Sequence, residues 1–195
     1  MRAKQINPAG RSSHEKPGLG LISRPVDIRF LLSGGDRRSI AQSDKVRKLV
    51  EKNPERVREL ARLTDDEDWL VAQRSFDLLE KIARDHPEWI EPHKHVFIGS
   101  KADSDKWEIR LQIVRSLPLF TWSAKDLSRV KTILLENVEY PQTFVKAWAL
   151  DSLSMFALKD KRLMPAVRHQ LEAFEKSDSK ALQARARRIR EALSG

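Results

Sequence analysis

The sequence predicts an all-α protein, a right-handed α-solenoid of about four to five helix pairs. Apolar residues recur at helical spacing in four stretches, residues 69–83, 107–120, 143–156 and 181–193. Their apolar stripes begin at Val71, Ile109, Val145 and Leu182, so successive starts lie 38, 36 and 37 residues apart. The chain of 195 residues is 33% charged and has only seven glycines, which favours helices. A recurrence of this length is typical of stacked helical repeats.

The first elements are predicted to be an arm and a cap. Residues 1–24 contain glycine, proline and scattered bases with few large apolar groups, which predicts a disordered basic arm. The repeat domain is expected to span residues 25–195. Residues 26–32 are expected to form a short capping helix that ends at Gly34 and Gly35. Asp36 is then expected to cap a helix over residues 37–51, a more polar copy of the repeat unit, as suits a terminal repeat.

A second apolar column supports the repeats, because it keeps one period in the segments that precede the four stretches. Its members are Leu60, Phe97, Leu134 and Leu171, each 37 residues apart. They predict partner helices, each joined by a short turn to the helix of the stretch that follows it. We call the helices of the four stretches the second helices. The last helix, residues 181–193, has a narrow apolar arc and several arginines, which is typical of a polar terminal cap.

The net charge of +9 lies at the two ends of the chain. Residues 1–38 hold eight bases and three acids, and residues 180–195 hold five bases and one acid. A partner attracted by charge would therefore contact the arm or the last helix. The chain has no apolar run long enough to span a membrane, so we expect no membrane association. The absence of cysteine fits a reducing compartment, and we expect a cytoplasmic protein. We also expect a monomer.

Acidic turns stand at residues 64–68 and 102–105, and the aliphatic–basic pairs Ile109-Arg110 and Val145-Lys146 open two of the second helices. With these features the predicted pairs resemble HEAT repeats of the armadillo-type superfamily. The same places at residues 71–72 and 182–183 lack the base, so the match is partial. The resemblance covers residue 37 to the C-terminus. It implies a binding scaffold whose second helices line the concave face.

One column beside the apolar stripes is a candidate partner-binding site on that concave face. Its members are Arg38, Arg74, Gln112, Trp148 and Arg185. Guanidinium groups beside a tryptophan suit acidic peptides, or phosphates and stacked bases. The alternative is that these residues make hydrogen bonds between repeats, for example to acidic turns at Asp66 and Asp68.

Four arginines are candidates for contact with an anion or a nucleic acid, namely Arg37, Arg187, Arg188 and Arg190. The turn at residues 34–39 opens a predicted helix and could hold a phosphate, but a helix-capping turn explains it as well. Trp148 and Asp151, with Trp107 as a second wall, also resemble the layout of HEAT-like DNA glycosylases, although no motif matches residue by residue.

No catalytic set, metal site or cofactor motif is recognisable. His86, Glu88, Glu91, His93 and His95 cluster in sequence, but a two-residue spacing points His93 and His95 to different faces of a helix. We therefore expect a non-enzymatic scaffold that binds a partner protein along its concave face, without metal or cofactor. The alternative is nucleic-acid binding through the basic arm and the last helix.

Overall fold

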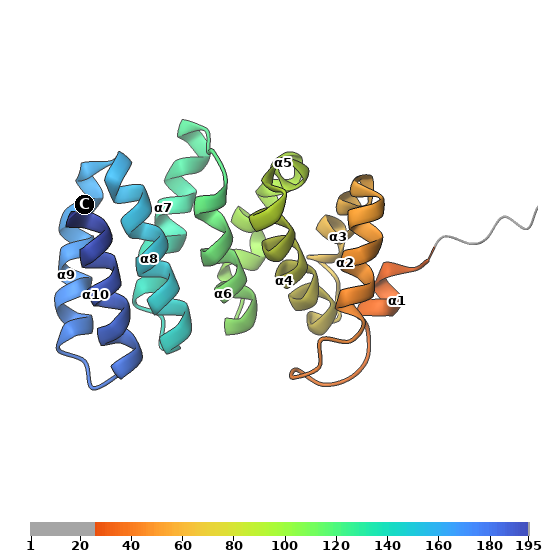
Figure 1. Cartoon of the computed structure of the whole chain (residues 1–195), viewed down its shortest axis with the longest axis horizontal. Coiled ribbons are helices and arrows are strands. Elements are labelled where there is room, and N and C mark those ends of the chain that lie inside the picture. Colours follow the sequence, from red (N-terminus) through yellow and green to blue (C-terminus); the bar gives the residue numbers. More distant parts are fainter. Residues whose placement is uncertain (1–25, 195) are drawn as a thin grey trace, which may run out of the picture.

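The computed structural model describes residues 26–194, which form a row of stacked helix pairs (Figure 1). The α-helices are α1 (Ile28–Leu32), α2 (Ser43–Lys52), α3 (Val57–Leu63), α4 (Trp69–Asp85), α5 (Pro87–Ile90), α6 (Trp107–Ser116), α7 (Ala124–Val138), α8 (Thr143–Lys159), α9 (Met164–Glu175) and α10 (Lys180–Ser194). Short 3-10 helices are η1 (Pro54–Arg56), η2 (Glu91–Ile98), η3 (Ser100–Asp103), η4 (Leu117–Leu119) and η5 (Lys161–Leu163). The arm predicted at residues 1–24 lies outside the described residues.

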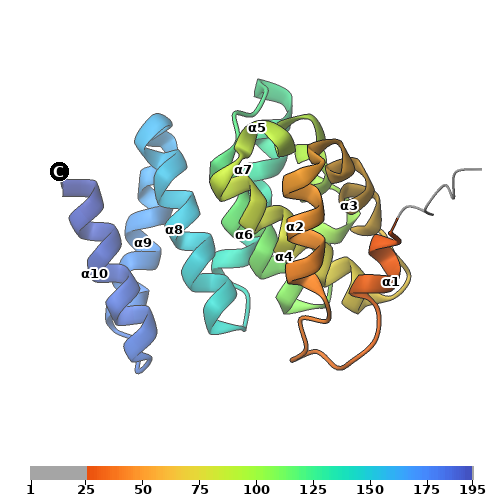
Figure 2. The same ribbon diagram turned by 45° about the vertical axis from the view of Figure 1, so that its right-hand side comes forward.

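The helices form two layers, as expected for an α-solenoid. In one layer α4, α6, α8 and α10 pack directly on one another in chain order (Figures 1 and 2). In the other layer, each partner helix packs on the helix that comes next in the chain: α3 on α4, α7 on α8, and α9 on α10. The predicted fold class is therefore confirmed. We call the side of α4, α6, α8 and α10 that faces away from their partner helices the second-helix face. Over residues 26–194, no helix is both long and apolar enough to cross a membrane.

The four predicted second helices are all present, and local chemistry sets their ends. Asp68 accepts a hydrogen bond from the Leu70 N–H and so caps the start of α4. α6 ends at Ser116, earlier than the predicted residue 120. Pro118 explains the difference, because proline has no N–H to continue the helical hydrogen bonds, and the chain goes on as η4.

The partner column is buried as predicted, although one of its segments is not a regular helix. Leu60, Phe97, Leu134 and Leu171 all lie in the core. Around Phe97, only α5 is α-helical, and η2 and η3 follow it. Phe97 packs against Phe120, with ring centroids 5.5 Å apart, and against Phe76 at 5.8 Å. The Phe97 ring therefore occupies the buried position that the period predicts, although the backbone around it is not a regular α-helix. Pro92 interrupts that backbone.

The helix predicted at residues 37–51 begins only at Ser43, which corrects that expectation. Residues 33–42 form a loop in which Gly34, Gly35 and Ala41 have positive φ angles of 78°, 72° and 49°. Asp36 accepts hydrogen bonds from the N–H groups of Arg38 and Ser39, so it caps a turn within this loop and not the start of α2.

Arg74, from α4, holds the loop by its backbone. Its guanidinium donates to four backbone carbonyls at 2.6–3.0 Å, those of Leu32, Gly34, Asp36 and Ser39. The Asp36 carbonyl also accepts from the Ser39 N–H at 3.0 Å, so these bonds fix a turn of the loop against α4. Arg74 is only 2% exposed, so its charge is solvated by the loop and not by water.

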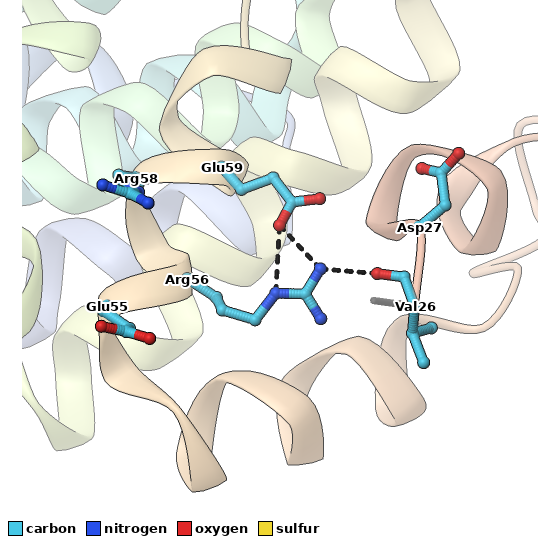
Figure 3. A pocket seen from close by; sticks show the side chains of 6 residues that line it. All are labelled: Val26, Asp27, Glu55, Arg56, Arg58 and Glu59. Atoms are coloured by element: carbon cyan, nitrogen blue, oxygen red, sulfur yellow. Dashed lines mark hydrogen bonds and ion pairs between the residues drawn. The ribbon is translucent and has the colours of Figure 1, made fainter. Parts of the chain in front are cut away.

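The start of the described chain is held by contacts with η1 and with the turn before α4. Arg56 of η1 donates to the Val26 carbonyl at 2.6 Å and pairs with Glu59 of α3 at 2.7 Å, so it bridges the two sides of a pocket (Figure 3). Arg29 of α1 pairs with Asp66 in the turn before α4 at 2.7 Å. The Arg29 hydrogen bond holds the pKa of Asp66 below its usual range. α1 is therefore fixed against the first helix pair, where the sequence predicted a cap.

We expect Arg74→Ala to lower the free energy of unfolding by about 2–3 kcal/mol, because several loop carbonyls lose a charged donor. Urea denaturation measures the change. The control is Lys81→Ala, which removes an exposed ion pair with Asp77 on the same helix and should cost less than about 0.5 kcal/mol. Equal effects of the two substitutions would show that Arg74 does not hold the loop.

Candidate partner-binding face

The structure separates the five residues of the predicted column. Arg74 and Gln112 are buried, at 2% and 6% exposed, so neither offers surface to a partner. Gln112 donates to Asp77 of α4 at 3.2 Å and accepts from Arg115 of α6. Both residues therefore join neighbouring elements, as the alternative interpretation of the column expected. Arg38 is exposed in the 33–42 loop and belongs to no helix.

Trp148 and Arg185 do lie together on the second-helix face. The guanidinium carbon of Arg185 lies 4.1 Å from the centroid of the Trp148 ring, and that of Arg115 lies 5.1 Å from it. Arg185 also pairs with Asp151 of α8 at 3.2 Å. The half-buried indole of α8 is thus held by cations from α6 and α10, each contact being worth about 0.5–2 kcal/mol.

A buried carboxylate extends this contact to α4. Glu80 is fully buried and pairs with Arg115 at 3.0 Å and with Arg84 of its own helix. Its Oε2 atom and the Nε atom of Arg115 have no hydrogen-bond partner within the described part of the chain. Sequence reasoning missed Glu80 and Arg115. The local pattern did not mark Glu80, because Glu80 and Lys81 stand together between the apolar residues 78–79 and 82–83, and Lys81 is exposed.

Together these side chains form one row across four helices. We call Glu80, Arg115, Trp148, Asp151 and Arg185 the inner row. Each base in it has a carboxylate partner, so its charges are neutralised within the protein. Its central member is a large aromatic ring that remains partly exposed. Such a row can present a rigid anchor to a partner, because its rotamers are fixed by packing and ion pairs.

The four arginines predicted to contact anions do not form one site. Arg187 and Arg188 are exposed on α10, whereas Arg190 pairs with Glu175 of α9. That hydrogen bond raises the pKa of Arg190 and lowers the pKa of Glu175. Arg37 lies at the other end of the molecule, 4.0 Å from Glu108 of α6. Of these four arginines, only Arg187 and Arg188 are therefore both neighbouring and exposed.

The residues compared with glycosylases and metal sites also separate. Asp151 is paired with Arg185, and Trp107 stacks on Phe144 at 6.5 Å. His86 contacts Glu88 at 3.2 Å, while His95 contacts Asp126 at 3.3 Å. Between residues 26 and 194, no three histidine or acidic side chains gather as metal ligands would. These residues make local contacts and form no common pocket.

We expect Glu80→Ala to lower the free energy of unfolding by about 2 kcal/mol. Removing one partner of a fully buried ion pair costs about 3–5 kcal/mol, but Arg84 and Arg115 reach water and recover part of this. Urea denaturation measures the loss. Glu136→Ala, at an exposed site on α7, is the control and should change the free energy by less than about 0.5 kcal/mol. A loss for Glu80→Ala no larger than for this control would contradict the prediction.

Comparison with known proteins identifies the fold and no function. No family model matches the sequence, and no curated protein matches it. An engineered protein of known crystal structure superposes with a TM-score of 0.59 at 16% identity, over 86% of this chain and 80% of its own. A designed armadillo repeat protein, solved in complex with the peptide (KR)4, gives 0.58 at 14% identity, over 85% of this chain and 80% of its own. The chain therefore has an armadillo/HEAT-like helical-repeat fold, as the resemblance implied.

Proposed function

We propose that this protein is a non-enzymatic repeat scaffold that binds a segment of a partner protein on its second-helix face. The observation that carries the proposal is the inner row, in which ion-paired side chains from α4, α6, α8 and α10 hold a partly exposed tryptophan. Aromatic anchors on rigid supports are the residues that dominate binding energy at protein interfaces.

The 33–42 loop supports this proposal from within the chain. Arg74 of α4 holds this non-helical segment by its backbone carbonyls, without using its side chains. α4 can therefore hold an irregular stretch of polypeptide. The designed armadillo repeat protein similar in structure binds a peptide of alternating lysine and arginine. In this chain the acids of the inner row already have basic partners, so we do not expect it to prefer that basic peptide.

Nucleic-acid binding is the alternative, and the exposed Arg187 and Arg188 favour it. Phosphate contacts release counterions, so such binding should weaken steeply between about 50 and 200 mM salt. Binding through Trp148 should depend much less on salt, because ring burial is not screened. A single-stranded oligonucleotide and a peptide, each titrated at both salt concentrations, distinguish the two functions.

The test is selection of peptides from a random display library against the full chain, followed by titration of the selected peptides. We expect Trp148→Ala to weaken their binding by at least about tenfold, because the central aromatic anchor is lost. The matched control is Trp89→Ala. Trp89 is also half-buried, but it stacks on His86, away from the inner row. Thermal unfolding followed by circular dichroism confirms that both variants fold.

Peptides that bind Trp148→Ala as tightly as the unmodified chain would overturn the proposal. So would steeply salt-dependent oligonucleotide binding with no selected peptide. A loss common to Trp148→Ala and Trp89→Ala would indicate general destabilisation and would also count against the second-helix face.

A further inference from the structure

α8 differs from the other long helices because apolar residues surround it on every side. It buries Val145, Ala149, Leu150, Leu153 and Ala157 against its neighbours. It also carries exposed apolar residues on the second-helix face. A helix that is apolar all round is normally covered all round. The exposed side of α8 is therefore suited to a partner that covers it.

The exposed apolar residues form a stripe along the axis of α8. Phe144, Trp148, Met155 and Leu158 recur at spacings of four, seven and three residues, which places them on one side of the helix. Phe144 is 56% exposed, and Met155 and Leu158 are each 48% exposed. From Phe144 to Leu158 the stripe is about 21 Å long. We call these four residues the α8 stripe.

The C-terminal end of the α8 stripe opens into an apolar pocket. Its walls are Met155, Phe156 and Leu158 of α8, with Pro118 and Phe120 from the segment after α6. Lys159 stands at its edge. A pocket at the end of an exposed apolar stripe can take one large apolar side chain of a partner.

The charged groups beside the α8 stripe that have no ion-pair partner in the described chain are basic. Arg115 of α6 and Arg185 of α10 flank the stripe, but the two carboxylates of the inner row neutralise them. One of these carboxylates, Asp151, lies on the same side of α8 as the stripe. Arg188 lies one turn beyond Arg185, and Lys159 ends the helix. No carboxylate of residues 26–194 pairs with Arg188 or Lys159, whereas Asp151 is occupied by Arg185. The surroundings of the stripe therefore attract acidic side chains.

Resting on the proposed function, we propose that the occupant is an amphipathic helix of a partner protein, apolar on one face and acidic on its flanks. It lies lengthwise on the α8 stripe, between α6 and α10. This places the partner along one helix, not across the repeats. A second copy of this chain would bring bases against bases. The chain's own first 25 residues hold five bases and one acid, so they are repelled in the same way.

The probes are two stapled helices of about 15 residues, the length that matches the α8 stripe. Both carry the same leucine face, one with glutamate flanks and the other with lysine flanks. Methyl NMR of the full chain is a direct readout, because the chain has only three methionines. We expect the glutamate helix to shift the methyl signal of Met155 and not that of Met164 on α9. Calorimetry should show the lysine helix binding at least about tenfold more weakly.

Phe144→Glu tests the stripe itself and should weaken the glutamate helix by at least about tenfold, because it places a charge within the apolar contact and near acidic flanks. Leu135→Glu is the control, an exposed leucine on α7 that is 39% exposed. It should leave the affinity unchanged. Both sites are exposed, so both variants should fold, and Phe144→Glu should lower the thermal midpoint slightly because it loses the stack on Trp107.

Three results would overturn this inference: no shift of Met155, equal binding of the two helices, or equal losses for Phe144→Glu and Leu135→Glu. They differ from failure of the proposed function. If library peptides depend on Trp148 while the glutamate helix does not bind, the second-helix face is a binding face and only the helical acidic partner is wrong. If the library peptides do not depend on Trp148 and the glutamate helix does not bind, both proposals fail.

Discussion

The structure depends on one constraint, that each second helix must bury apolar surface against helices on both sides. α6 packs on α4 and α8, and α8 packs on α6 and α10. A single pair could not bury such wide apolar faces, so stability comes from neighbours in the row. The α6–α8 interface is close, because the buried Ser152 hydroxyl of α8 donates to the Val114 carbonyl of α6 at 2.6 Å.

The ends of such a row need other contacts, because the terminal helices lack one neighbour. At the start, charged groups meet this need: Arg74 holds the 33–42 loop, and Arg29 and Arg56 fix α1. At the other end, Arg190 ties α10 to Glu175 of α9. At the terminal elements, charged contacts thus add to the apolar packing that joins all the helices.

The second-helix face combines fixed charges with an uncovered apolar helix. In the inner row, Glu80 and Asp151 neutralise Arg115 and Arg185, which hold Trp148 between them. The period of the sequence placed Trp148 and Arg185 on one side of their helices, so their proximity could be predicted. Arg115 and Glu80 could not be placed in this way, because a base or an acid on a helix has many possible partners until the crossing of the helices selects one.

The sequence by itself determined the repeat, its second helices and its buried column, since apolar spacing is a local property that every unit carries. Leu60, Phe97, Leu134 and Leu171 are buried even where the backbone around Phe97 departs from a regular helix. Only the tertiary structure decided which groups Arg74 binds. Its acceptors are main-chain carbonyls 35 to 42 residues away, and every residue has a carbonyl, so residue types do not identify them. Once that guanidinium is buried, its N–H groups need acceptors, and they find them in the loop that precedes α2.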